Sequence, residues 1–229
     1  MALTNDELEH YSPSVQRTLG RPRPKWRGVM HRWAFFASIP IGIAVVIHAQ
    51  GTVDRVGAAT FGFGVTLMLG VSTLVHLKTY EPKRLEFLFN LDHSAIFLCI
   101  ATGATAVALM GLDGNRRIIL VVAYWLGALV GLSAVWLPFH PPKGLMNFLF
   151  LVLGWTALPM GPALWDNLGG DGMLLLGIGA AFYTVGAVIV GSRRPDPAPT
   201  IFGYHEIWHL FVIIAVGFHY ALVFFVLTA

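Results

Sequence analysis

Long apolar runs alternate with short polar connections along the chain from residue 33 onward. A membrane-spanning helix needs about 20 mostly apolar residues, because the hydrocarbon core of a bilayer is about 30 Å thick. The pattern therefore predicts an all-α integral membrane protein, with a polar N-terminal segment at 1–32 and a seven-helix transmembrane bundle at 33–229. The spanning segments are expected at about 33–49, 58–77, 91–110, 118–138, 145–165, 172–191 and 203–227.

Composition agrees with a membrane protein and narrows its chemistry. Apolar residues make up 56% of the chain and charged residues 12%, whereas a soluble domain is nearer half apolar and a quarter charged. The single cysteine, Cys99, excludes an intramolecular disulfide and argues against a cysteine-based metal site. No spanning segment carries an arginine ladder, which argues against voltage sensing. The seventh segment has no lysine that could form a retinal Schiff base.

The distribution of basic residues predicts the orientation. If the N-terminus lies in the cytosol, twelve of the 15 lysines and arginines fall in cytosolic segments. The three on the outer side are Arg55, Arg116 and Arg117. Short cytosolic loops carry an excess of Lys and Arg. We therefore expect a multi-pass protein of the cell membrane with a cytosolic N-terminus and an external C-terminus.

Five polar residues share one depth near the cytosolic end of the predicted bundle. His205 and His209 lie four residues apart, and so on one helix face, at the start of the seventh segment. Ser72 and His76, also four apart, end the second segment, and Asp92 is expected in the first turn of the third. Polar groups at membrane depth are costly, which makes them functional-site candidates.

Three imidazoles suit a catalytic zinc site, in which three protein ligands leave the fourth position open to water. We expect His76, His205 and His209 to bind zinc, which would lower the pKa of a bound water to about 7. Asp92 is predicted to hold the site by hydrogen bonding or to act as the general base that takes the water proton. Ser72 is predicted to orient the water or a substrate carbonyl.

Other polar residues near this site are expected to have structural roles. Glu206 occupies the position of the general base in the HExxH motif of soluble metalloproteases, but we favour a place at the cytosolic rim, paired with Arg193 or Arg194. His93 follows the aspartate immediately and so points elsewhere around its helix. His219 lies far deeper in the seventh segment and is expected to be a packing residue.

Four blocks of the sequence resemble the hemolysin III family, the bacterial branch of the progestin and adipoQ receptor family. Three are the signature blocks at Ser72–His76, Leu91–Phe97 and Gly203–His209, and the fourth is Arg27–His31 before the first span. The blocks occur in the family's order and spacing over nearly the whole membrane part. The resemblance implies a seven-helix bundle with a cytosolic N-terminus.

The resemblance also implies zinc near the cytosolic face, held by His76, His205 and His209, with Asp92 and Ser72 at the matching acid and serine. Animal relatives are linked to hydrolysis of lipid amides such as ceramide. Bacterial members are named for haemolysis and are also linked to membrane-lipid homeostasis.

These observations favour a zinc-dependent hydrolase of lipid amides or esters. One alternative is a membrane sensor or regulator in which zinc is structural, and another is a cytolytic pore. A pore would need a polar lining through the bilayer, whereas the polar residues cluster at one end. Membrane lipids are the expected partners and nucleic acid is not; protein partners are open.

Overall fold

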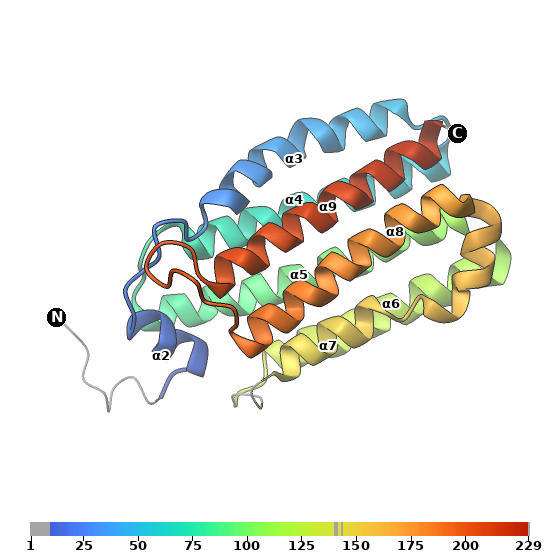
Figure 1. Cartoon of the computed structure of the whole chain (residues 1–229). Helices are drawn as coiled ribbons and strands as arrows, with labels where there is room; N and C mark the ends of the chain where they lie inside the picture. Colours follow the sequence, from blue (N-terminus) through green and yellow to red (C-terminus); the bar gives the residue numbers. More distant parts are fainter. Residues whose placement is uncertain (1–9, 140–141, 143, 229) are drawn as a thin grey trace.

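The computed structural model describes residues 10–139, 142 and 144–228, which form helices and no strand. The side chains of residues 227 and 228 lie outside this description, as do the first nine residues of the predicted N-terminal segment 1–32. Most of the helices run side by side in one elongated bundle (Figure 1). In chain order they are α2 (Pro13–Leu19), α3 (Val29–His48), α4 (Thr52–Leu77), α5 (Pro82–Gly111), α6 (Gly114–Val135), α7 (Leu145–Gly154), the 3-10 helix η1 (Leu158–Met160), α8 (Gly161–Ser192) and α9 (Tyr204–Thr228).

Six helical stretches are long and apolar enough to cross a membrane, which confirms an all-α, multi-pass membrane protein. One of them, Leu145–Ser192, joins α7, η1 and α8 over 48 residues. A straight helix of that length would measure about 72 Å, more than twice the hydrocarbon core. The stretch is instead interrupted after Gly154 and again at Gly169, whose φ of 64° and ψ of −177° are accessible to glycine alone. The connection expected between residues 165 and 172 is therefore a kink at Gly169 between two helical stretches, and not an irregular loop.

Several helices begin earlier than the apolar pattern predicts. Helix α3 starts at Val29, inside the segment 1–32, α4 starts at Thr52 rather than near residue 58, and α5 starts at Pro82 rather than near residue 91. Proline suits the first helical position because the missing N–H is one that a helix start leaves unpaired. An apolar run shows which residues contact lipid, but it does not show where the helix begins, because a helix can extend beyond the lipid. Asp92 consequently lies ten residues into α5, about 15 Å from its start, so its predicted place in a first turn is wrong.

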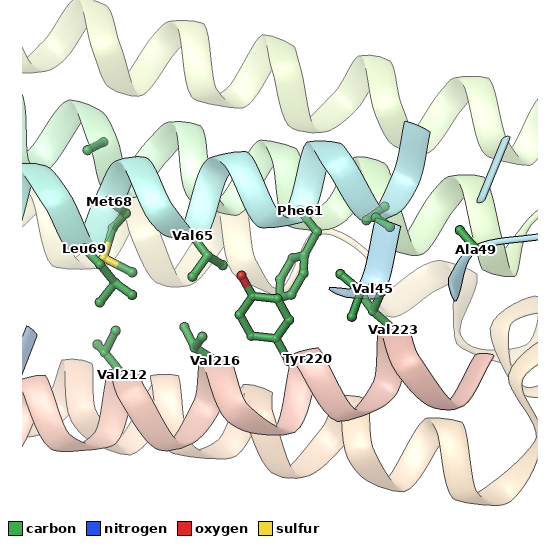
Figure 2. Close-up of a cluster of buried hydrophobic side chains, with 13 residues drawn as sticks. Val45, Ala49, Phe61, Val65, Met68, Leu69, Val212, Val216, Tyr220 and Val223 are labelled. Atoms are coloured by element: carbon green, nitrogen blue, oxygen red, sulfur yellow. The ribbon is translucent and has the colours of Figure 1, made fainter. Parts of the chain in front are cut away.

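Apolar side chains fill the interior between α3, α4 and α9 (Figure 2). Phe61 of α4 faces Tyr220 of α9 with ring centroids 4.8 Å apart. A second buried cluster joins α5, α6, α7 and α8. Large apolar residues such as Trp33 and Ile47 remain exposed on the outside of the bundle, where lipid covers them. The helices that carry the predicted polar residues are thus held in register by packing along their length.

Candidate metal centre

Three histidines from two helices meet at the end of the bundle near α2. His76 lies in the last turn of α4, and His205 and His209 lie in the first two turns of α9. The Nε2 atoms of His76 and His205 are 3.2 Å apart. One ring nitrogen from each of the three residues lies within 4.8 Å of the others, and His76 and His209 are buried. The structure therefore brings the predicted ligands together as a group that could hold a metal ion.

The spacing of this group can be tested against tetrahedral coordination. Zinc–nitrogen bonds of about 2.0–2.1 Å at tetrahedral angles place two ligand nitrogens about 3.3 Å apart. The 3.2 Å between Nε2 of His76 and Nε2 of His205 is close to that value, and one ring nitrogen of each of the three histidines lies within 4.8 Å of the others. Neutral imidazole is also a donor that zinc accepts. The residues present fit a zinc ion.

Residues 23–28 of the N-terminal segment wrap around the C-terminal end of α4. The guanidinium of Arg23 donates to the carbonyl oxygen of His76, which has no partner within the helix. Partial burial, and then nearby Arg27, lowers the pKa of Arg23 from its ordinary value. Gly28 has φ of 76°, and a Cβ there would lie 2.6 Å from the Cβ of His76. A side chain at Gly28 would therefore displace His76, one of the three candidate metal ligands.

Glu206 lies in the interior and is not at the cytosolic rim. Its side chain is 1% exposed; Oε1 lies 2.6 Å from Nε of Arg27, and Oε2 accepts the backbone N–H of Gly203 at 2.9 Å. The expected pairing with Arg193 or Arg194 is therefore wrong. Glu206 occupies the third position of α9 and caps its first turn. With both oxygens engaged, it lacks the free carboxylate of a general base.

His31, in the first turn of α3, belongs to the centre although its sequence position assigned it no role. Its ring stacks on that of His209, with centroids 3.7 Å apart and an interplanar angle of 6°. Its Nδ1 lies 2.8 Å from Oγ of Ser72, and the residue is 2% exposed. In the sequence, the Arg27–His31 block indicated the family resemblance but did not indicate that His31 contacts His209 or Ser72.

Ser72 and Asp92 complete the group of five predicted residues. Ser72 lies one turn before His76 on α4 and is buried, and the Asp92 carboxyl is close enough to interact with its hydroxyl. Asp92, His76 and His205 line one cavity of about 1300 Å³, which we call the site cavity. Three of the five predicted residues therefore line the site cavity, and the other two adjoin them: Ser72 lies beside Asp92, and His209 groups with His76 and His205.

The remaining histidines named from sequence lie apart from the three ligands. Nδ1 of His93 lies 2.7 Å from the carbonyl oxygen of Phe89 in its own helix, and its ring stacks on Phe150 while lining the site cavity. His219 lies deeper in α9, where Nε2 is 3.4 Å from the carbonyl oxygen of Leu176. Neither residue joins the metal-binding group.

Comparison of the sequence with known proteins identifies the family of this chain. A sequence model of the haemolysin-III-related family matches residues 20–220. The chain belongs to the haemolysin-III-related family. It is 32% identical to Hemolysin-3 of Bacillus cereus over 191 residues, covering 81% of this chain and 83% of the relative. The Hemolysin-3 homolog of Bacillus subtilis (strain 168) is 31% identical over 191 residues, or 81% and 85% of the two chains.

The haemolysin-III-related chain also resembles animal proteins of the progestin and adipoQ receptor type. It is 26% identical to the human monocyte to macrophage differentiation factor over 171 residues, covering 73% of this chain and 68% of that protein. The family match includes the three histidines, Ser72 and Asp92, and it begins early enough to include Arg23, Arg27 and His31. The part of the N-terminal segment that wraps the metal centre is therefore part of the family's own domain.

Proposed function

We propose that this chain is a zinc-dependent hydrolase of lipid amides or esters that acts near the cytosolic face of the cell membrane and affects membrane-lipid homeostasis. The observation that carries the proposal is that three imidazoles converge beside a cavity that also exposes the Asp92 carboxyl. A structural zinc site is closed by four protein ligands, whereas a catalytic site keeps one position open. Three clustered nitrogens beside a cavity of about 1300 Å³ support the catalytic kind.

The proposed topology has seven crossings with the N-terminus in the cytosol. Helix α9 ends at the opposite end of the bundle from α2 (Figure 1), which favours an odd number of crossings. The break after Gly154 and the kink at Gly169 divide Leu145–Ser192 into two passes. The charge distribution along the loops supports the cytosolic side for the metal centre.

In this proposal the chain's own groups orient the substrate and move one proton. Bound zinc would supply a Lewis acid and a water that ionises at neutral pH. The Ser72 hydroxyl donates a hydrogen bond to the acyl carbonyl oxygen, where negative charge develops. Asp92 accepts a proton from the water and returns it to the departing nitrogen or oxygen. The water oxygen joins the acyl carbon, the C–N or C–O bond breaks, and the products are a fatty acid and an amine or alcohol.

The test combines metal analysis of the purified full chain with a lipid-hydrolysis screen. D92N should keep the zinc content of wild type and lose turnover by about 10²–10⁴-fold. H209A should lose zinc, and H219A, which removes a histidine of the same helix outside the centre, should keep both zinc and turnover. Stoichiometric zinc without fatty-acid release from any amide or ester would refute the hydrolase.

A structural role for zinc is the second candidate, favoured by the origin of the ligands in α4 and α9, which a metal would join. A sensor with structural zinc should keep its physiological effect in D92N. The apolar side chains that fill the bundle beyond the centre argue against a conducting pore. Zinc-independent conductance of the pure protein in planar bilayers would support a pore instead.

A further inference from the structure

Three arginines gather beside the site cavity and take no part in the proposed mechanism. Arg21, Arg193 and Arg194 line a second cavity of about 460 Å³, which we call the arginine cavity. The one acid in its wall is Asp196, and Oδ1 of that residue already accepts the backbone N–H of Tyr204 at 3.1 Å. Three arginines therefore share this wall with a single acid, one of whose carboxylate oxygens already accepts a hydrogen bond.

These arginines have no acidic partner among residues 10–139, 142 and 144–228, where the ion pairs are Arg27–Glu206 and Arg117–Asp113. Like charges held close together repel one another unless an anion lies between them. Guanidinium presents a planar fork of N–H donors that matches phosphate or carboxylate oxygens two at a time. The arginine cavity is therefore suited to an anionic group.

The backbone holds two of the arginines at this wall. Arg193 ends α8 in the left-handed region, with φ of 60° and ψ of 30°. Glycine is the usual residue there, because a Cβ disfavours this conformation. The chain turns at this residue, so that Arg193 and the next arginine both line the cavity rather than following the helix axis.

The arginine cavity adjoins the site cavity. Arg21, Arg193, Asp196 and Tyr204 line both. The ring of Tyr204 lies 6.3 Å, centroid to centroid, from the ring of the ligand His205. In a phospholipid, a few bonds separate the phosphate from the first acyl carbonyl. A phospholipid whose phosphate lies at the arginines can therefore extend its acyl ester into the site cavity, which His76 and His205 line. The apolar wall residues suited to its acyl chain are Phe89, Ile96 and Phe150.

We propose that the arginine cavity binds the phosphate headgroup of an anionic phospholipid and presents its acyl ester to the metal centre. The step that follows rests on the hydrolase proposed above, whereas the binding does not. In that step the water oxygen joins the acyl carbon, the ester C–O bond breaks and the alcohol oxygen takes the proton. The products are a fatty acid and a lysophospholipid.

The test measures lipid binding to the full chain in detergent micelles, using phosphatidylglycerol and phosphatidylcholine with identical acyl chains. R21Q/R194Q removes two charges from the arginine cavity, and R32Q/K83Q removes two exposed charges that line neither cavity. Affinity for phosphatidylglycerol should fall at least about tenfold in R21Q/R194Q and less than about twofold in R32Q/K83Q. Phosphatidylcholine should bind more weakly than phosphatidylglycerol, and equally to all three proteins.

An equal loss in both double variants would overturn the proposal, because surface charge alone would then explain the binding. Competition by inorganic phosphate at the concentration of the lipid would overturn the lipid assignment. In turnover, R21Q/R194Q should raise KM for phosphatidylglycerol and leave kcat unchanged. Selective binding of phosphatidylglycerol without hydrolysis would support the arginine site and refute the hydrolase. Hydrolysis that does not depend on the headgroup, and that is unchanged in R21Q/R194Q, would support the hydrolase and refute the arginine site.

Discussion

The buried ion pair between Arg27 and Glu206 connects the N-terminal segment to the helix that carries two of the three candidate ligand histidines. The glutamate side chain is 1% exposed and that of the arginine is 18% exposed, with 2.6 Å between Nε and Oε1. We consider R27M, E206Q and the double variant, because methionine and glutamine remove charge with a small change in volume. The unequal burial predicts unequal effects.

R27M leaves the Glu206 carboxylate in the interior, where the backbone N–H of Gly203 still donates a hydrogen bond to it. Breaking a buried pair from one side costs about 3–5 kcal/mol of unfolding free energy, because a buried charge remains uncompensated. E206Q should cost less, about 1–3 kcal/mol, because the guanidinium keeps some contact with solvent and the amide oxygen can still accept from Gly203. The double variant lacks both charges of this pair and should be more stable than R27M.

The assay is reversible unfolding of the purified chain in mixed micelles, followed by circular dichroism, with zinc content measured in parallel. Both single variants should also lose zinc occupancy, since Glu206 lies between His205 and His209 in the sequence. A double-mutant cycle gives the coupling energy, for which we expect about 2 kcal/mol or more. If E206Q proved more damaging than R27M, or the two losses simply added, the uncompensated-charge argument would be refuted.

Three further predictions concern the metal centre. G28A should weaken zinc binding and destabilise the fold by more than about 2 kcal/mol, because a left-handed alanine costs about 1–2 kcal/mol and its Cβ would lie 2.6 Å from that of His76. G144A, at φ of 87° with nothing within 4 Å of the added Cβ, should show the backbone cost alone in the same assay. H31F keeps a flat ring beside His209 and removes the contact with Ser72. The zinc content should stay the same while turnover falls about tenfold, which corresponds to the free energy of about one hydrogen bond. Loss of zinc in H31F would contradict this prediction. Chelation should lower Tm, and zinc should restore it, because an ion bound at about 100 times its Kd stabilises the folded state by about 2.7 kcal/mol.

Much of the centre could be predicted from the chain because the bilayer restricts where polar residues lie. Helices that cross the same slab return to the same depth, so His76, Asp92 and His205 could be placed at one level from topology alone. Periodicity added that residues four apart share a face, which paired Ser72 with His76. These local regularities required no knowledge of which helices are neighbours.

Other features depended on contacts between segments far apart in sequence. Glu206 could have paired with any nearby cation, and the N-terminal segment brings Arg27 to it across 179 positions. His31 reaches His209 because α3 packs against α9. The helix starts at Val29 and Pro82 also escaped the hydropathy pattern, since that pattern measures contact with lipid and not the hydrogen bonding that extends a helix into water.

The sequence by itself determined the membrane class, the family blocks and the depth shared by three histidines, one serine and one aspartate, because each follows from local composition and helical repeat. The tertiary structure alone decided that the N-terminal segment contacts the centre, that Glu206 is buried in an ion pair, and that Arg21 lines one cavity together with Arg193 and Arg194. The physical reason is that burial and charge pairing depend on which segments pack against one another. The helical repeat shows which residues share a face, but it does not show which segment that face contacts.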